Sequence, residues 1–218
     1  MKKIFSLVLD VVYEDEALAV IHKPSGIPTS GNYFKTITNA LPFNLKRSGE
    51  KDALATPLPV HRLDNPTSGL LLIAKNKSAQ VALNRLFEER KIYKTYHALV
   101  LGKIEDSLRL NTPIAGKEAE TNILPIAQYL IKDTYFSLVK AFPESGRTHQ
   151  IRIHLSENDH PIVGDKLYGT ASEIIQKGGL FLAATGLEFQ HPVTGEKLKF
   201  ELPLPKKFRR IKELKTNT

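Results

Sequence analysis

The segment Val60-His61-Arg62-Leu63-Asp64-Asn65-Pro66-Thr67-Ser68-Gly69 leads directly into the apolar run Gly69-Leu70-Leu71-Leu72-Ile73-Ala74. Asn-Pro and Ser-Gly are turn signals, and an apolar run of this length is typical of a buried strand. We therefore expect Asp64 at a turn that precedes a buried strand. If Arg62 lies in extended backbone, its side chain points the same way as that of Asp64. Taken alone, the segment also fits a simpler structure, in which the Asp64 carboxylate accepts hydrogen bonds from the turn amides and Arg62 forms a surface ion pair.

Around this run the sequence predicts more strands than helices, mostly joined by short turns. The expected strands are Val11–Tyr13, Ala17–His22, Lys94–Leu101, Tyr135–Ala141, Leu180–Ala184, Leu187–Phe189 and Lys197–Leu202. The expected helices are a part of the irregular stretch Ser30–Pro59 around Thr36–Leu45, Ser78–Arg90 capped by Asn76 or Ser78, and Phe208–Leu214. This pattern indicates an α+β fold, with a mixed and largely antiparallel sheet flanked by helices. No linker is visible, so residues 1–218 are expected to form a single domain.

Composition narrows the classes of function. The 218 residues include no cysteine, which excludes disulfide frameworks, thiolate metal sites and cysteine nucleophiles. No apolar run approaches the roughly 20 residues of a membrane span, and the short apolar start ends at Asp10 without a cleavage site. A cytoplasmic protein without a membrane partner is expected. The net charge of +8 favours a polyanionic partner, nucleic acid before membrane.

Two further segments could carry chemistry. In a strand, Lys94, Tyr96, Ala98 and Val100 share one face, so Tyr96 could offer its ring for stacking, although a cross-strand aromatic is the simpler reading. In Ser145–Leu155 we expect a helix that starts near Thr148 as N-cap. Two arginines and two histidines at its start could hold an anion. The alternative is a solvated basic helix face.

Metal and nucleotide chemistry find little support in the sequence. The possible nitrogen and oxygen ligands are His149, His154, His160, His191, Asp159 and Asp165. The spacing of His149 and His154 does not place both on one helical face, so no metal site is expected. No glycine-rich phosphate loop and no serine-hydrolase elbow occur, so no nucleotide cofactor is expected.

Taken in order, these segments closely resemble the RluA-type pseudouridine synthases, which isomerise uridine within RNA. The resemblance rests on five stretches spread over nearly the whole chain: Val20-Ile21-His22-Lys23-Pro24-Ser25-Gly26, His61-Arg62-Leu63-Asp64 with Thr67-Ser68-Gly69-Leu70-Leu71, Lys94-Thr95-Tyr96-His97-Ala98, Gly146-Arg147-Thr148-His149-Gln150-Ile151-Arg152, and Ile162–Gly169 with Leu182-Ala183-Ala184 and His191-Pro192. One departure is Ala183, where family members often carry histidine. The amino-acid sequences of the second and third stretches look most like those of the tRNA-modifying branch of this family.

The resemblance implies a fold with a central RNA-binding cleft and a role for each matched residue. Asp64 is the implied nucleophile, Tyr96 the tyrosine that stacks on the base, and Arg152 the arginine that favours the ionised carboxylate. His61, Arg62, Arg147 and Leu182 are the implied substrate-binding residues. The resemblance leaves open whether Asp64 attacks the sugar or the base, or acts by elimination. Only the fold could bring Asp64 and Arg152 together.

The implied partner is RNA, either tRNA or rRNA, and the implied reaction needs no cofactor. The additional N-terminal RNA-binding domain of many relatives has no room here, so recognition is expected from the loop Tyr33–Lys51 and from Lys206, Lys207, Arg209 and Arg210. A monomer is expected, since no heptad pattern occurs. Two alternatives stay open: a non-catalytic RNA-binding or ribosome-assembly factor on the same fold, and a metal-dependent nuclease, which a chelator would inhibit.

Overall fold

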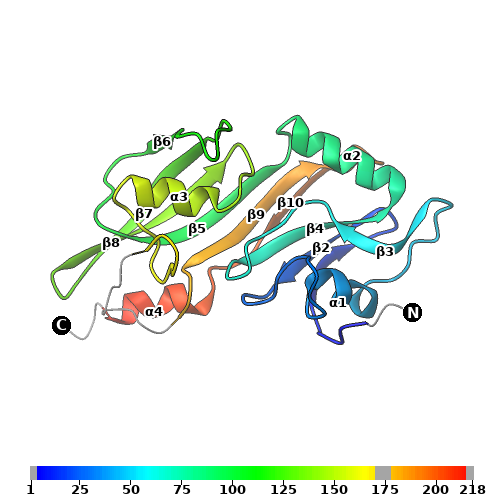
Figure 1. Cartoon of the computed structure of the whole chain (residues 1–218), viewed down its shortest axis with the longest axis horizontal. Helices are drawn as coiled ribbons and strands as arrows, with labels where there is room; N and C mark the ends of the chain where they lie inside the picture. Colours follow the sequence, from blue (N-terminus) through cyan, green and yellow to red (C-terminus); the bar gives the residue numbers. More distant parts are fainter. Residues whose placement is uncertain (1–3, 170–177, 215–218) are drawn as a thin grey trace. The chain divides into compact units, whose positions relative to one another are not determined.

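The computed structural model describes residues 4–169 and 178–214, and the chain divides into two compact units (Figure 1). The first unit comprises Met1–Ile92 and Leu187–Phe200, and the second comprises Tyr93–Gly186 and Glu201–Thr218. The chain leaves the first unit after Ile92. It returns to that unit within the strand β9 (Leu182–Gln190) and leaves it again after Phe200. The expectation of a single domain stays a prediction.

The first unit is built on antiparallel strands. β1 (Asp10–Glu14) pairs with β2 (Leu18–Lys23), and β2 pairs with β4 (Ser68–Asn76). β3 (Ala53–Pro59) also pairs with β4, and β10 (Lys197–Glu201) pairs with β9. The apolar run expected to form a buried strand is confirmed, because β4 is buried from Gly69 to Asn76.

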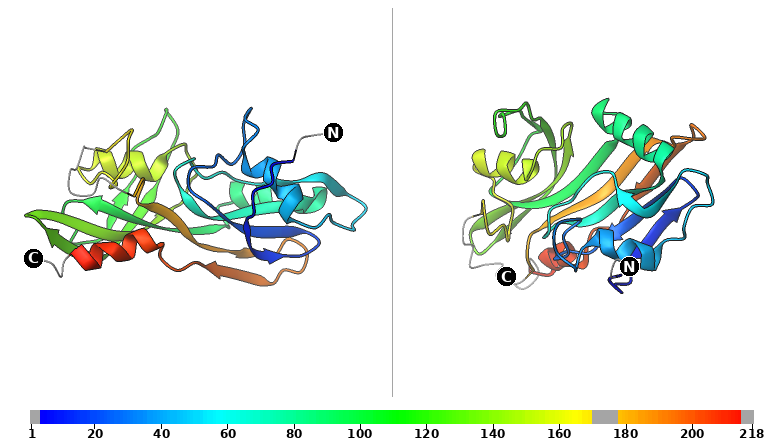
Figure 2. Two further views of the ribbon diagram at one scale, coloured as in Figure 1. Left: turned by 90° about the horizontal axis from the view of Figure 1, so that it is seen from below. Right: turned by 45° about the vertical axis from the view of Figure 1, so that its right-hand side comes forward.

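Two helices pack on these strands (Figure 2). α1 (Ile37–Asn44) lies against β3, and α2 (Lys77–Glu88) lies against β3 and β4. Each begins where a side chain accepts a hydrogen bond from a free backbone N–H: Thr36 from Asn39 and Asn76 from Ala79. The sequence expectation of a helix around Thr36–Leu45 and of an Asn76 cap is therefore confirmed.

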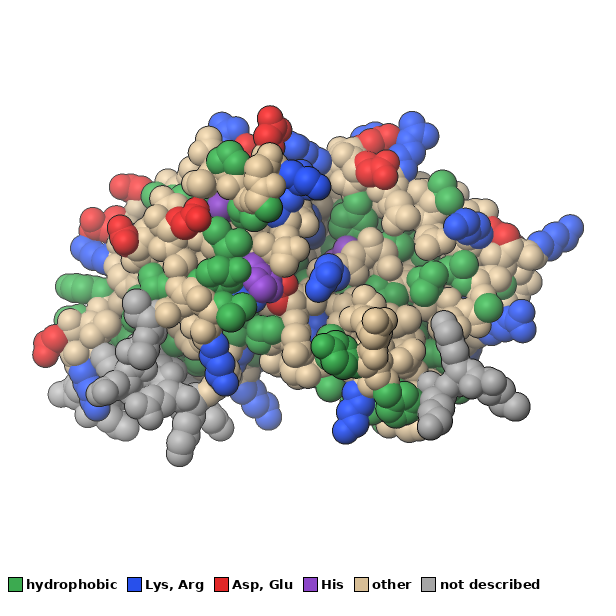
Figure 3. Space-filling model, viewed as in Figure 1, with side chains coloured by type: hydrophobic (Ala, Val, Ile, Leu, Met, Phe, Trp, Pro, Cys, Tyr) green, Lys and Arg blue, Asp and Glu red, His purple; other side chains and the backbone are tan. Residues whose placement is uncertain are grey.

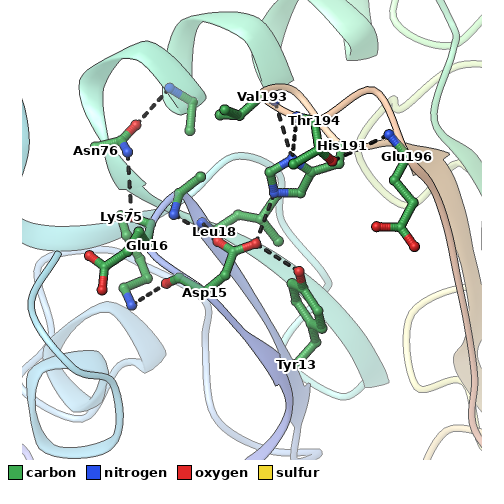
Figure 4. A network of polar contacts seen from close by, with 12 residues as sticks. Tyr13, Asp15, Glu16, Leu18, Lys75, Asn76, His191, Val193, Thr194 and Glu196 are labelled. Carbon is green, nitrogen blue, oxygen red and sulfur yellow. Dashed lines mark hydrogen bonds and ion pairs between the residues drawn. The ribbon is translucent and has the colours of Figure 1, made fainter. Parts of the chain in front are cut away.

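A polar network closes this unit at the turn between β9 and β10 (Figure 4). The Nδ1 atom of His191 accepts hydrogen bonds from the backbone N–H groups of Val193 and Thr194, and its Nε2 donates to Asp15 at 2.8 Å. Tyr13 donates to the same carboxylate, and this bond with burial raises the pKa of Tyr13 to about 12. The network joins the β1–β2 turn to the turn at residues 191–196. It therefore connects the two separate stretches of sequence that make up this unit.

The second unit has the strand order β5-β8-β7-β6, with every neighbouring pair antiparallel. The strands are β5 (Tyr93–Leu101), β6 (Leu108–Leu110), β7 (Thr121–Ile131) and β8 (Thr134–Pro143). α3 (Gln150–Glu157) packs on β7 and β8, and α4 (Lys206–Leu214) packs on β7 (Figure 2). The expected α+β class with largely antiparallel strands is confirmed. In the described part of the chain, no helix is both long and apolar enough to cross a bilayer.

Some strands were not expected from the sequence. β3 contains Pro57 and Pro59, and β7 contains Pro125 at a register irregularity, where the missing N–H is tolerated. The separate strands expected at Leu180–Ala184 and Leu187–Phe189 are wrong, because β9 runs through Gly186 without a break. A Cβ at Gly186 would lie 2.8 Å from the Cβ of Thr95, so glycine here permits close packing rather than a turn.

Candidate functional site

Asp64 lies on the loop between β3 and β4, as the turn signals indicate. Its backbone carbonyl accepts a hydrogen bond from the N–H of Thr67 at 3.0 Å, which closes a turn over Asn65 and Pro66. Leu63 is buried, Asp64 is half-buried and Arg62 is exposed. We call residues 60–67 the Asp64 loop. Asp64 therefore lies in a hydrogen-bonded turn that leads into the buried strand β4.

Lys23, at the end of β2, is fully buried beside this loop. Its ammonium donates to the carbonyls of Pro24 at 2.9 Å and Ile27 at 2.8 Å, and to that of Asn65 at 3.2 Å. Burial lowers the pKa of Lys23 to about 8, and the negative charge of Asp64 opposes the shift. A cation is therefore held close enough to Asp64 to interact with its charge.

The segment after β2 fastens the Asp64 loop at two more points. The Gly26 N–H donates to the Asn65 carbonyl at 2.8 Å, and the Ser25 hydroxyl donates to that of Pro66 at 2.7 Å. Gly26 has a φ of 85°, a conformation that favours glycine. These bonds give a structural reason for the residue types found in the Lys23-Pro24-Ser25-Gly26 segment.

Thr29 and His61 hold the other side of the Asp64 loop. The buried Thr29 hydroxyl donates to the carbonyl of Leu63 at 3.1 Å and accepts from its N–H at 3.2 Å. The Nε2 atom of His61 accepts from the N–H of Leu72 in β4 at 3.0 Å, and its ring packs 5.1 Å from that of Phe87. Substrate binding by His61 stays a prediction, but this ring nitrogen already anchors the loop to β4.

In the second unit, Lys94 and Tyr96 share a face of β5, as the alternation indicates. Tyr96 is half-buried against the core of this unit. Burial lowers the pKa of Lys94 to about 8, with the charge of Glu144 opposing, and its ammonium donates to the Ser145 carbonyl at 3.3 Å. Lys94 thus fastens the start of the Gly146–Arg152 stretch to the strand that carries Tyr96.

Arg152 is buried in α3 and forms a bidentate ion pair with Asp165. Its Nε lies 2.7 Å from Oδ2 and its second terminal nitrogen 2.8 Å from Oδ1. Burial alone would raise the pKa of Asp165, but hydrogen bonds from Arg152 and from the N–H groups of Leu167 and Tyr168 outweigh it and lower this pKa. The guanidinium also lies 5.1 Å from the centre of the Tyr168 ring. Sequence reasoning considered Asp165 only as a metal ligand and missed this pair.

The start of α3 differs from the sequence expectation. Thr148 is not the N-cap: His149 occupies that position with a φ of 57° and makes no capping bond from its side chain. Gln150, the first residue of the helix, instead holds the preceding turn, because its Oε1 accepts from the Arg147 N–H at 3.0 Å. Arg147 also donates through Nε to the carbonyl of Glu118 at 3.0 Å.

The reading of α3 as a solvated basic face is also wrong, because its polar residues face the protein. Gln150 donates to the carbonyl of Glu120 at 2.8 Å and to the hydroxyl of Thr121 at 3.0 Å. His154 is fully buried between that hydroxyl and the carbonyl of Thr112, each at 2.9 Å. These contacts hold α3 on β7, which fixes the position of Arg152.

The site residues expected from the sequence are divided between the two units. His61, Arg62 and Asp64 belong to the first unit, and Tyr96, Arg147, Arg152 and Leu182 belong to the second. Leu182 is buried in the core of its unit. In the terminal helix, Lys206 and Arg209 are exposed, whereas Lys207 donates to the carbonyl of Leu180 and burial lowers its pKa to about 8. The side chain of Arg210 lies outside the described residues.

Most of the metal-ligand candidates have protein partners. His149 bonds Tyr168, His160 bonds the carbonyl of Leu101, and His191 bonds Asp15, beside the pairs of His154 and Asp165 given above. The described residues hold no group of three or more His, Asp or Glu side chains arranged for a metal ion. Lys23 and Thr29 are the residues that sequence reasoning missed. Lys23 belongs to the first stretch of the resemblance and ends a mostly apolar strand before Pro24, but nothing in the sequence around it indicates a role.

Comparison with known proteins identifies the family to which this chain is similar. The model of the RNA pseudouridylate synthase family matches residues 17–157, which include Lys23, Asp64 and Arg152. An "Uncharacterized RNA pseudouridine synthase" of Aquifex aeolicus is 36% identical, over 93% of this chain and 72% of that protein. The "Ribosomal large subunit pseudouridine synthase D" of Neisseria meningitidis serogroup B is 34% identical over 91% of this chain, which spans 59% of its length.

A solved structure shows the same fold. "Human RNA Pseudouridylate Synthase Domain Containing 1" matches with a TM-score of 0.73 and 27% identity, over 90% of this chain and 83% of that one.

Proposed function

The chain belongs to the RNA pseudouridylate synthase family, and we propose that it isomerises uridine to pseudouridine in RNA with Asp64 as the nucleophile. In this reaction the bond between N1 and C1′ breaks, the base rotates while bound, and a bond between C5 and C1′ forms. C5 loses its proton and N1 gains one, so substrate and product have the same composition. No redox partner or external energy source is needed.

The single observation that carries the proposal is the support of the Asp64 loop. A nucleophilic carboxylate must be ionised and fixed in orientation. The buried ammonium of Lys23 donates to the Asn65 carbonyl and interacts with the charge of Asp64, while Thr29 and the His61 bond to β4 hold the backbone on both sides. A turn aspartate of no further role would need none of these three supports.

Other residues of the reaction are proposed from the same family membership. Tyr96 would stack on the uracil and help to move the C5 proton. Arg152 would contribute charge to the reaction, and its pair with Asp165 would set its orientation. Arg62, exposed next to Leu63, would contact the nucleotide beside the flipped uridine, since a base within a helix must be flipped out before it reacts.

We further propose large-subunit ribosomal RNA as the substrate, ahead of tRNA. The named relative from Neisseria meningitidis is a ribosomal large subunit synthase, and it matches 91% of this chain. Because the chain spans 59% of its length, its substrate is carried over here only as a proposal. Several lysines and arginines exposed in both units suit a polyanion.

The test is pseudouridine formation on defined RNA pools. Unmodified transcripts of large-subunit rRNA and of bulk tRNA are incubated separately with the full chain, with and without a chelator, then digested and analysed by nucleoside chromatography with mass detection. New pseudouridine in the rRNA transcript is the expected result. Pseudouridine in tRNA alone would reverse the substrate assignment.

Asp64→Ala serves as the matched control, because the Asp64 loop is held by backbone bonds that this change leaves in place. No product from either pool, with RNA still bound, would favour the non-catalytic RNA-binding factor. Activity that disappears only with chelator would favour a metal-dependent enzyme.

A further inference from the structure

We propose that Tyr33, Phe34 and the cations around helix α1 form a binding surface for unpaired bases of the RNA substrate. We call this surface, made of the loop 31–35 and the exposed side of α1, the α1 surface. Tyr33 is 70% exposed and Phe34 is 47% exposed, in a unit whose other aromatic rings mostly pack inward. The inference rests on the proposed function, because it takes RNA as the partner.

The two rings are held on a fixed backbone rather than on a free loop. The Asn39 side chain in α1 donates to the carbonyls of both Tyr33 and Phe34, at 3.2 and 3.0 Å. Phe5 packs its ring 5.8 Å from that of Phe34, and its N–H donates to the carbonyl of Asn39. A platform whose position is fixed in this way loses little entropy when a base stacks on it.

The charge of the α1 surface fits a polyanion. Residues 31–47 carry Lys35, Lys46 and Arg47 and no aspartate or glutamate. All three cations are exposed. Figure 3 shows hydrophobic side chains with lysine or arginine side chains beside them over α1 and the segment that leads into it. The carboxylate of Glu14, in β1, accepts from the Lys46 N–H at 2.8 Å, so one acid lies at the far end of this segment. Aromatic rings beside cations are the usual composition of a single-stranded nucleic acid site.

The α1 surface is connected directly to the Asp64 loop within the first unit. The carbonyl of Thr29 accepts from the N–H and the hydroxyl of Thr38, which follows the N-cap of α1. The hydroxyl of the same Thr29 bonds both backbone groups of Leu63, next to Asp64. RNA bound at the α1 surface would therefore be fixed relative to the proposed nucleophile through one residue.

These observations favour RNA over a protein partner or a second copy of the chain. Protein interfaces are depleted in lysine at their centre, whereas lysine here lies next to the exposed rings. Paired bases hide their faces within the stack, so the α1 surface should prefer single-stranded or looped RNA. It would hold nucleotides that flank the target uridine.

The experiment compares the double variant Tyr33→Ala/Phe34→Ala with the wild type, both as full chains. The probes are a fluorescein-labelled 20-nucleotide oligouridylate and a 20-base-pair RNA duplex, and affinity is measured by anisotropy. We expect the affinity for oligouridylate to fall about tenfold or more, the usual effect of removing a ring on which a base stacks. The affinity for the duplex should change less than threefold.

Tyr135→Ala is the matched control, because Tyr135 is a 45% exposed aromatic in the second unit. It should leave both affinities unchanged. The variant Lys46→Ala/Arg47→Ala should instead flatten the salt dependence, by about 0.7 in the log–log slope for each phosphate that the variant no longer neutralises.

The outcomes separate this proposal from the proposed function. Loss of oligouridylate affinity in the double variant, together with a wild type that makes no pseudouridine, would support the surface and overturn the activity. Unchanged affinity in the double variant, with wild-type activity, would overturn the surface alone. A change of oligomeric state on gel filtration, without a change in RNA affinity, would also overturn it and indicate an interface between copies.

Discussion

Two buried cations, Lys23 and Arg152, are held by different kinds of partner. Lys23 is surrounded by neutral carbonyls, and the charge that acts on it is that of Asp64. Arg152 has a carboxylate, Asp165, in a bidentate pair. In the first arrangement neutral groups bind the ammonium, and in the second a carboxylate is bonded directly to the guanidinium. Burial of a cation therefore does not by itself tell what the cation does.

Because the two cations have different partners, removing the carboxylate that pairs with Arg152 should have a different effect from removing the ammonium of Lys23. Loss of the Asp165 carboxylate should first destabilise the second unit. Loss of the Lys23 ammonium should disturb the Asp64 loop as well as stability, because one of its carbonyl partners lies next to Asp64.

The largest expected effect is that of Asp165→Asn, which removes the negative charge that forms the bidentate pair with the buried Arg152. Breaking one side of a buried ion pair costs about 3–5 kcal/mol, and urea unfolding monitored by circular dichroism measures this loss. Glu89→Gln is the control, because its pairs with Arg85 and Lys91 lie at the surface, where screening by water leaves little net stabilisation. A loss for Asp165→Asn no larger than that for the control would contradict the structural role.

The same pair predicts a pH dependence. The pKa of Asp165 is lowered in the folded state from its ordinary value of 3.8. Its stabilisation is therefore fully present above that value and is lost as the pH falls through the folded-state pKa. The difference in unfolding free energy between the wild type and Asp165→Asn should be constant from pH 5 to pH 7 and shrink below about pH 4. A difference that grows on acidification would show the opposite sign.

A smaller effect is expected for Lys23→Met, which nearly keeps the length of the side chain and removes the ammonium. Its carbonyl partners at Pro24, Ile27 and Asn65 lose their donor, at a cost of about 2–3 kcal/mol. At a temperature where the variant is fully folded, kcat for pseudouridine formation should fall while KM for RNA changes little. An unchanged kcat would reduce Lys23 to a residue of structural importance only.

The smallest effect is expected for Thr67→Val. Within residues 4–169 and 178–214, the Thr67 hydroxyl is the buried side-chain polar atom that has no hydrogen-bond partner. Its replacement by a methyl group of similar size should leave stability unchanged or raise it by up to about 1 kcal/mol. Thermal unfolding measures this change. A clear loss of stability would mean that the hydroxyl has a partner, such as bound water.

The sequence predicts the elements with strong local signals well. The apolar run of β4, the Asn76 cap of α2 and the turn that carries Asp64 all depend on neighbouring residues, and all are confirmed. β3 and β7 contain prolines, which disfavour strands, and each becomes a strand through pairing with a neighbouring strand, β4 and β8 respectively. Local propensity carries no information about such pairing.

The candidate residues were found by their pattern, but their partners were not. Asp165 follows Arg152 by 13 positions, and the Asn65 carbonyl lies 42 positions from Lys23. Contacts over such separations are set by the fold. The N-cap at His149 was missed because a left-handed backbone without a side-chain cap bond has no common sequence signal.

The most direct test of the central claim is a comparison of Asp64→Asn with the wild type for RNA affinity and for pseudouridine formation on the large-subunit rRNA transcript. The change keeps the size of the side chain and removes its negative charge. If Asp64 is the nucleophile held beside Lys23, the variant folds, binds the transcript with wild-type affinity and forms no pseudouridine. Product at the wild-type rate from Asp64→Asn, and from Asp64→Ala as a guard against deamidation, would contradict the account.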